Sequence, residues 1–222
     1  MTDPLPRLRP PTPERPLLGR CILLVEDSRY ASDAIRLLSL ASGARIRRAD
    51  SLAAAERHLA AYRPDIAIVD LGLPDGSGAA LIERLDRARP RVPAVIGISG
   101  EPGARGAAAA AGADTFLEKP VTSLASFQEA ILPFLPADLR PCGPRALPAG
   151  HVTPDDIAYR DDLAHAASLL GSAGDGELDY LRRFLSGLAR SAGDEELRTV
   201  AEGPPAALAA VLATRLERRM AV

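Results

Sequence analysis

The 222-residue sequence predicts an α/β domain with a doubly wound parallel sheet, followed by a small all-α domain. The first observation is an alternation, repeated five times between residues 20 and 136, of a short apolar segment and a segment with helical spacing. The second is that these apolar segments show no polar face, which is typical of parallel strands covered by helices on both sides. The third is that only helical patterns follow residue 154.

Each expected strand is followed directly by an expected helix. The strands span residues 21–25, 44–49, 65–70, 92–99 and 114–119. The helices span residues 28–42, 51–62, 79–89, 103–112 and 123–135. Because crossovers between parallel strands are short and right-handed, a sheet of this size favours the flavodoxin-like strand order 2-1-3-4-5.

Local signals support the individual elements. CILLV, a continuous apolar run, opens the alternation. ARIRRA (44–49) is a weaker strand, and Pro64 ends the helix that follows it. The turn cluster LPDGSG (73–78) separates the apolar strand DIAIVD from the third helix. The strands VPAVIGIS and DTFLEK flank GARGAAAAAG, which we expect to form a short helix.

We expect four segments along the chain. They are a disordered proline-rich tail (1–19), the α/β domain (20–136), a proline-rich linker (137–154) and an α-helical output or interaction module (155–222). The composition, 47% hydrophobic and 25% charged, is typical of a soluble globular protein.

Charge, hydropathy and cysteine content narrow the class of protein. The formal net charge of −2 gives no global indication of binding to nucleic acid or an anionic membrane. No apolar run approaches the ~20 residues that span a bilayer, so no membrane association is expected. Cys21 and Cys142 are too few for a disulfide framework or a zinc site, which favours a cytoplasmic location.

Charged and hydroxyl side chains follow four of the expected strands. Glu26 and Asp27 come after the first strand and Asp70 ends the third, while Ser99 ends the fourth and Lys119 ends the fifth. Because ligands of open parallel sheets bind beyond the carboxyl ends of the strands, we expect these side chains to share one rim. Lys119 is the only lysine in a chain with 27 cationic side chains, so its retention indicates that this position requires a lysine.

Such a rim indicates phosphoryl chemistry. Two unit charges ~4 Å apart repel by about 4 kcal/mol at an effective dielectric near 20, so three acids need a divalent cation or a proton. Oxygen ligands beside an open rim suit Mg²⁺. A metal, a hydroxyl and an ammonium together neutralise a transferring phosphoryl group, which a carboxylate can accept.

Residues 20–136 resemble the response-regulator receiver domain of two-component signalling. The resemblance is carried by ILLVEDS (22–28), IVDLGLPDGSG (68–78), Ser99 and FLEKP (116–120), in order and at suitable spacing. It implies that a histidine kinase or a histidine phosphotransfer protein donates a phosphoryl group to Asp70. The chain would then act as a phospho-acceptor switch that promotes its own phosphorylation and dephosphorylation, and not as an enzyme.

The resemblance also implies roles for individual residues. The implied Mg²⁺ ligands are Glu26, Asp27, Asp70 and the main-chain carbonyl of Gly72. Ser99 and Lys119 would bind the phosphoryl oxygens, and Ser99 and Phe116 would form the switch. A cis Lys119–Pro120 bond is implied as well, in line with the general confinement of cis bonds to proline.

Some features depart from this pattern or have simpler explanations. Gly100, Gly103 and Gly106 depart from it and put the rigidity of the fourth helix in doubt. Asp27 or Ser28 could only cap the first helix. Asp70 could be a turn acid, Ser99 a loop hydroxyl and Lys119 a solvated strand end. A stand-alone hydrolase that uses the acid cluster is a further alternative, although no other substrate-pocket signature is visible.

Three interpretations remain for the helical module. The spacing of Ala189 and Gly193 suggests a divergent helix-turn-helix, as in a transcriptional regulator. Three acids follow this spacing, however, where a recognition helix would begin. The 10 arginines and 13 acids of residues 137–222 also give this region a net charge of −3, which does not favour DNA. A phosphotransfer module is suggested by His165, although the cation expected shortly after it is absent. A helical bundle for dimerisation or docking of a protein partner is favoured, which makes DNA an improbable partner. Phe184, Leu185, Leu188 and Leu197 are then core residues.

Overall fold

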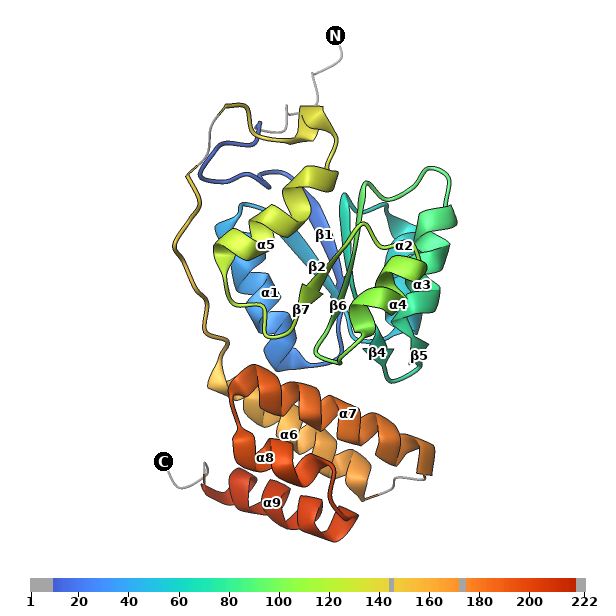
Figure 1. Ribbon diagram of the computed structural model, residues 1–222, viewed down its shortest axis with the longest axis vertical. Coiled ribbons are helices and arrows are strands. Elements are labelled where there is room, and N and C mark those ends of the chain that lie inside the picture. Colours follow the sequence, from blue (N-terminus) through green and yellow to red (C-terminus); the bar gives the residue numbers. More distant parts are fainter. Residues whose placement is uncertain (1–9, 144–145, 172–174, 219–222) are drawn as a thin grey trace.

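A computed structural model describes residues 10–143, 146–171 and 175–218 of the chain (Figure 1). Its main sheet has five parallel strands in the order β2-β1-β3-β6-β7. The strands are β1 (Cys21–Val25), β2 (Arg45–Ala49), β3 (Ile66–Asp70), β6 (Ala94–Ser99) and β7 (Thr115–Glu118). Counted within this sheet, the order is the expected 2-1-3-4-5. A small hairpin, β4 (Gly72–Leu73) with β5 (Gly76–Ser77), forms where a turn was expected.

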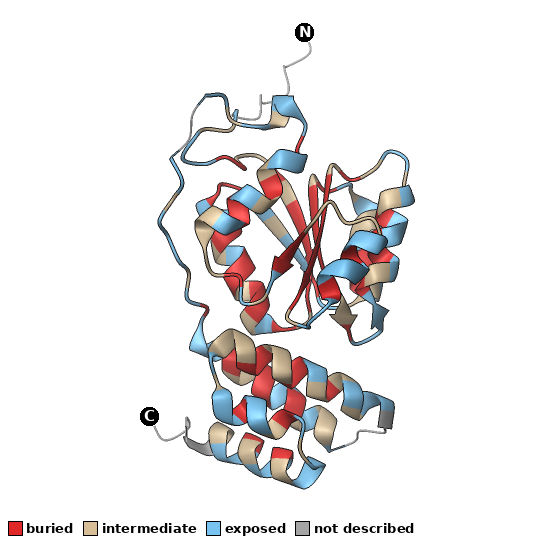
Figure 2. Ribbon diagram, viewed as in Figure 1, coloured by how far each residue is buried: buried red, intermediate tan, exposed pale blue. Residues whose placement is uncertain are grey.

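Helices cover both faces of the sheet, as Figure 1 shows. One face carries α1 (Arg29–Ala41) and α5 (Leu124–Ile131), and the other carries α2 (Leu52–Ala61), α3 (Gly78–Arg87) and α4 (Ala104–Ala110). Side chains alternate between two cores: Ile22 and Leu24 pack on the side of α1, whereas Leu23 and Val25 pack on the side of α2 and α3. All four are fully buried, which explains why the strands are apolar on both faces (Figure 2).

The segments around this α/β domain differ in part from expectation. Residues 10–19, expected to be disordered, contain Leu17, which is fully buried and whose amide donates to the carbonyl of Ser42. Burial of this apolar side chain offsets part of the entropy cost of ordering the segment. Residues 1–9 of the expected tail lie outside the described residues. The helix expected over 123–135 is divided into two elements: α5 ends at Ile131, and the 3-10 turn η1 (Leu132–Phe134) follows it.

The expected linker runs beside the α/β domain. It begins with the 3-10 turn η2 (Ala137–Leu139), and further on His151 forms a β-bridge with Ser123. The amide of Val152 donates to the carbonyl of Thr122. Figure 1 shows the segment passing along one side of the domain to the start of the next helix.

Among the described residues after 154, four further helices form the helical module. They are α6 (Asp156–Leu170), α7 (Asp175–Ala192), α8 (Glu195–Ala201) and α9 (Pro205–Arg218). The module has its own core, which contains Phe184, Leu185, Leu188 and Leu197, as expected (Figure 2). No helix in the described part of the chain is long and apolar enough to cross a membrane.

The module packs against the carboxyl-end edge of the sheet, with α6 and α7 in contact with α1 (Figure 1). Asp162 of α6 makes several of the polar contacts between the two domains. Its carboxylate accepts hydrogen bonds from Ser28 Oγ at 2.8 Å and from the amides of Arg29 at 2.8 Å and Tyr30 at 3.0 Å. Asp162 is 2% exposed. A carboxylate of one domain therefore caps the first helix of the other.

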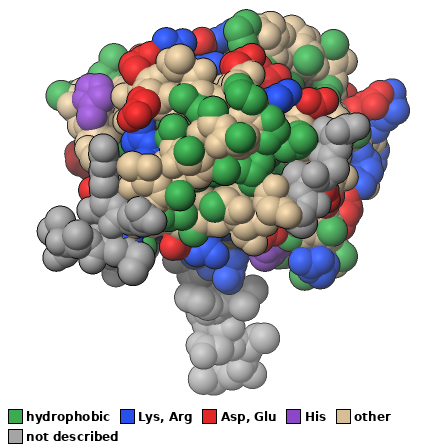
Figure 3. All heavy atoms as spheres, turned by 90° about the horizontal axis from the view of Figure 1, so that it is seen from below, with side chains coloured by type: hydrophobic (Ala, Val, Ile, Leu, Met, Phe, Trp, Pro, Cys, Tyr) green, Lys and Arg blue, Asp and Glu red, His purple; other side chains and the backbone are tan. Residues whose placement is uncertain are grey.

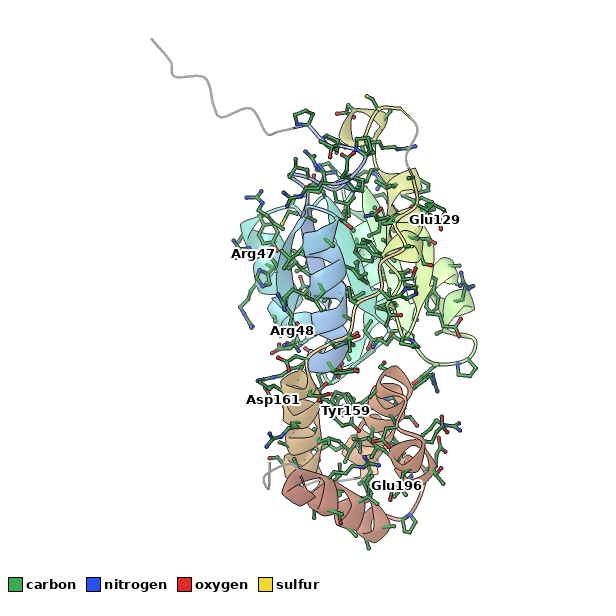
Figure 4. The ribbon with its side chains drawn as sticks, turned by 90° about the vertical axis from the view of Figure 1, so that its left-hand side faces the viewer. Arg47, Arg48, Glu129, Tyr159, Asp161 and Glu196 are labelled. Atoms are coloured by element: carbon green, nitrogen blue, oxygen red, sulfur yellow. The ribbon has the colours of Figure 1, made fainter. Side chains whose placement is uncertain are left out.

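A neighbouring acid offers a contrast. Asp161 forms an ion pair with Arg29 at 2.6 Å, but both side chains are largely exposed. Figure 4 shows Asp161 at the end of α6 that faces the α/β domain. Exposed pairs of this kind contribute little to stability because water screens them.

These contacts predict unequal effects of two neighbouring substitutions. Asp162→Ala should lower the free energy of unfolding by about 2 kcal/mol, because it leaves buried donors of α1 without an acceptor. Asp161→Ala should lower it by less than about 1 kcal/mol. Urea denaturation of the full chain measures both values. Equal effects of the two substitutions would contradict the assignment of Asp162 as the main polar contact.

Candidate functional site

Three carboxylates meet at the carboxyl edge of the sheet. Glu26 and Asp27 directly follow β1, and Asp70 is the last residue of the neighbouring strand β3. One carboxylate oxygen of each residue lies within 4.8 Å of those of the other two. Glu26 is fully buried and Asp70 is 5% exposed. The strand order therefore brings together the three acids that the sequence analysis singled out.

Lys119 lies between two of these acids. It directly follows β7, and its Nζ is 2.7 Å from Glu26 Oε2 and 3.0 Å from Asp70 Oδ2. Its side chain is 10% exposed. The ammonium therefore lies at the acid cluster itself and is not a solvated strand end.

Burial and mutual repulsion govern the electrostatics of the cluster. Burial raises the pKa of Glu26 well above its usual range, and Asp70 and Asp27 raise it further against the attraction of Lys119. Burial also raises the pKa of Asp70, against the attraction of Lys119. Burial alone would lower the pKa of Lys119, but the three carboxylates outweigh it, so this pKa is raised and the ammonium stays charged. The single positive charge of Lys119 thus cannot neutralise all three carboxyl groups when they are ionised, and the cluster then has an excess of negative charge.

Backbone contacts position Asp70. The amide of Gly72 donates a hydrogen bond to the Asp70 carboxylate. At Gly78, where α3 begins, a Cβ would lie 1.8 Å from the carbonyl oxygen of Asp70, so only glycine fits there. The Lys119–Pro120 bond is cis, as the resemblance implied; Arg89–Pro90 is also cis, which the sequence did not indicate.

Ser28 and Ser99 have distinct positions near the cluster. Ser28 caps α1, because its Oγ accepts from the amide of Ala31 at 3.0 Å. Ser99 ends β6, is 5% exposed and accepts a hydrogen bond from the amide of Glu101 at 3.1 Å. Both serines border the same cavity as Asp70, and Ser28 in addition holds the start of α1.

Phe116 lies on β7 and points away from solvent. It is 8% exposed and packs with Ala104 and Ala108 of α4. The guanidinium carbon of Arg105 lies 5.1 Å from the centre of its ring. The side chain of Phe116, the expected switch aromatic, is therefore buried in this structure.

The donor set fits a hard divalent cation. Glu26, Asp27 and Asp70 offer only oxygen ligands, which Mg²⁺ prefers. Glu26 Oε2 is buried and, among the atoms that the structure describes, accepts no well-aligned hydrogen bond despite its ion pair with Lys119. It therefore keeps a lone pair for a cation. Gly72 borders the same cavity, which places its carbonyl in the neighbourhood of the cluster.

A cavity of about 700 Å³ opens beside the cluster and extends to the helical module. Its far wall is formed by α7, including Arg182, Arg183 and Arg190. Tyr180 of the same helix donates a hydrogen bond to Asp27 Oδ2 at 2.5 Å. Burial and the charge of Asp27 raise the pKa of Tyr180, so its hydroxyl stays protonated as a donor.

The residues that the module contributes to the site could not be identified from the sequence. Asp162, Tyr180 and Arg190 belong to ordinary helical patterns, and no local motif marks them. The two adjacent acids Asp161 and Asp162 are a weak indication of a contact between the domains. A helix buries an acid only where another part of the protein provides hydrogen-bond donors for it.

A flavodoxin-like sheet with an acid cluster, a hydroxyl and a lysine at its carboxyl edge defines the receiver class of signalling domains. The family model described as "Response regulator receiver domain" matches residues 22–131. These residues form a response regulator receiver domain of two-component signalling.

Individual relatives match part of the chain. KdpE, the KDP operon transcriptional regulatory protein of Escherichia coli (strain K12), is 36% identical over 100 residues, 45% of this chain and 44% of that protein. PhoP, a virulence transcriptional regulatory protein of Salmonella typhimurium, is 40% identical over 63 residues, 28% of each chain. The matches thus span less than half the length of these relatives. The solved receiver domain of a signal transduction histidine kinase from Syntrophus aciditrophicus has 25% identity and a TM-score of 0.48, over 53% of this chain and 90% of that one.

The raised pKa of Asp70 predicts how stability depends on pH. A carboxyl whose pKa is higher in the folded state binds more protons there than when unfolded, so stability falls as pH rises through that range. In metal-free buffer at pH 8, Asp70→Asn should therefore be more stable than wild type by on the order of 1 kcal/mol. The difference should shrink toward pH 4.

Denaturant titrations across this pH range measure the difference. Asp138→Asn, which changes an exposed acid of the linker, is the matched control and should stay within about 0.5 kcal/mol of wild type. If Asp70→Asn were the less stable protein at pH 8, attraction by Lys119 would outweigh burial and repulsion.

Proposed function

We propose that Asp70 accepts a phosphoryl group from a phosphohistidine of a kinase or phosphotransfer protein, in a Mg²⁺-dependent reaction. The observation that carries this proposal is the position of Asp70: its Oδ2 lies 3.0 Å from Lys119 Nζ, with two further carboxylates within 4.8 Å and an open cavity beside it. The protein is thereby a switch that changes state on phosphorylation, and not an enzyme acting on a separate substrate.

The side chains divide the chemistry among them. A carboxylate oxygen of Asp70 attacks phosphorus and forms an O–P bond, while the P–N bond breaks and its electron pair returns to the imidazole of the donor. Lys119 and the Ser99 hydroxyl bind the phosphoryl oxygens. Glu26, Asp27, Asp70 and the carbonyl of Gly72 would hold Mg²⁺, which neutralises charge on the transferring group.

The proposed output of the helical module is a protein contact that follows the state of the receiver domain. In the described part of the module, the acids of the candidate recognition helix already have partners: Arg215 forms ion pairs with Asp194 at 2.5 Å and with Glu196 at 2.9 Å. Figure 3 shows the module face opposite the receiver domain, where nonpolar side chains gather at the centre. The exposed residues of α9 include Ala206, Ala209, Ala210 and Ala213.

Two alternatives concern the same module. KdpE and PhoP are named transcriptional regulatory proteins, which makes DNA a candidate partner for this chain as well. The acids at the start of α8 would face phosphates and argue against it. The phosphotransfer alternative depends on His165, which is exposed on α6 with its ring centre 6.1 Å from that of Phe184. This edge-to-face contact is the geometry of ordinary aromatic packing.

Phosphorylation with a small donor tests the acceptor role. The full chain incubated with acetyl phosphate and Mg²⁺ should gain the mass of one phosphoryl group, and Asp70→Asn should gain none. Lys119→Met should slow the gain by about 100-fold, the usual loss for one preorganised donor. Intact-mass spectrometry follows all three proteins. A phosphoryl group gained by Asp70→Asn, or none gained by wild type, would contradict the proposal.

Retention of the full chain on DNA tests the output. We expect no salt-dependent retention by duplex DNA, with or without acetyl phosphate, because the region after residue 136 has more acids than arginines. Binding that weakens steeply with salt would instead support the transcriptional alternative.

A further inference from the structure

Arg190 reaches from the helical module to the receiver site, and Gly100 makes room for it. Gly100 follows Ser99 directly and was one of the glycines that departed from the receiver pattern. A Cβ at this position would lie 2.7 Å from Nη1 of Arg190 and 3.7 Å from Cβ of Lys119. The guanidinium group therefore lies over Gly100, in the immediate neighbourhood of Lys119.

In the part of the chain that the structure describes, Arg190 has no acidic partner. Among the residues that the structure describes, no carboxylate forms an ion pair with its guanidinium, although other arginines of the chain are paired. It shares the cavity of about 700 Å³ with Asp70 and Ser99. An unpaired guanidinium beside a phosphorylation site is suited to an anion, because its planar fork matches phosphate oxygens.

We propose that Arg190 binds the phosphoryl group carried by Asp70, so that phosphorylation tightens the contact between the receiver domain and the helical module. This inference rests on the proposed acceptor role of Asp70. It assigns to the module a phosphate ligand that the receiver domain itself does not supply.

Charge explains why the contact strengthens only after phosphorylation. Before transfer, Asp70 is a carboxylate with one negative charge, and Lys119 is 3.0 Å away. An acyl phosphate at the same position carries about two negative charges. Lys119 and the proposed Mg²⁺ contact this charge from the receiver side, and Arg190, which forms no ion pair with a described carboxylate, lies on the opposite wall of the cavity.

The module is already placed for this contact. Asp162 is bound to the start of α1, and Tyr180 donates to Asp27 from the same helix that carries Arg190. These contacts hold α7 across the rim without using the guanidinium. Binding of the phosphoryl group then requires a movement of the arginine side chain and no new docking of the module, which keeps its entropic cost small.

Hydrogen–deuterium exchange of the full chain tests the proposal. Wild type is compared before and after incubation with acetyl phosphate and Mg²⁺, with intact mass confirming the phosphorylated fraction. Amide exchange in α7 (Asp175–Ala192) should slow by about fivefold on phosphorylation, the lower end of the usual coupling between linked sites. Arg190→Ala, phosphorylated to the same fraction, should show less than about a twofold change.

Three further variants test whether the slower exchange of α7 depends on the guanidinium of Arg190. Gly100→Ala should reproduce the effect of Arg190→Ala, because its Cβ displaces the flexible end of the arginine without disturbing a core. Arg190→Lys should retain part of the slowing, since it keeps the charge but loses the fork. Arg198→Ala, which removes an exposed arginine paired with Glu195 on α8, should behave as wild type.

Each outcome has one meaning. If wild type gains no phosphoryl group, the acceptor role of Asp70 fails, and the inference fails with it. If wild type is phosphorylated but α7 exchanges faster, or if Arg190→Ala shows the same slowing as wild type, the acceptor role stands and the role of Arg190 is overturned. If only Arg190→Ala fails to gain the group while keeping the wild-type unfolding midpoint, Arg190 contacts the phosphoryl group during transfer, which supports the proposal.

Discussion

The contact of one ammonium group with two buried carboxylates is the constraint on which this site depends. Lys119 Nζ lies 2.7 Å from Glu26 and 3.0 Å from Asp70, at the ends of three strands of one sheet. Without the ammonium of Lys119, the acids would raise each other's pKa further, and a smaller fraction of them would be ionised. Arginine would bring a wide planar group into a position that holds a compact charge. This explains the retention of the one lysine in a chain that otherwise uses arginine.

Around this contact, the protein supports the acid cluster from two domains. The receiver domain supplies the strand ends, the Gly72 amide and the close turn at Gly78. The helical module supplies the Tyr180 hydroxyl, which orients Asp27 by a hydrogen bond at 2.5 Å. Groups of this second kind fix the direction of ligand oxygens and thereby influence metal affinity. The module is therefore part of the environment of the site and not a separate body on a linker.

The sequence predicted the parts of the structure that depend on local pattern and topology. Apolar strands gave the sheet order, and that order placed Glu26, Asp70, Ser99 and Lys119 on one edge. The sequence could not predict the position of the module, because an amphipathic helix shows that a face is buried but not against what. Asp162 and Tyr180 were missed for this reason. Leu17 was missed because a pair of leucines in a proline-rich segment carries no periodicity.

The chemical character of the domain contact matters for its use in a switch. Packing between apolar surfaces depends little on charge, so a phosphoryl group added nearby would leave such an interface almost unchanged. Here the contact includes a tyrosine bound to Asp27 and an acid bound to Ser28, which directly follows Asp27 and caps α1. The energies of these hydrogen bonds depend on the charge of the acid cluster. A polar interface at this edge therefore couples the state of the site to the position of the module, whereas an apolar one would not.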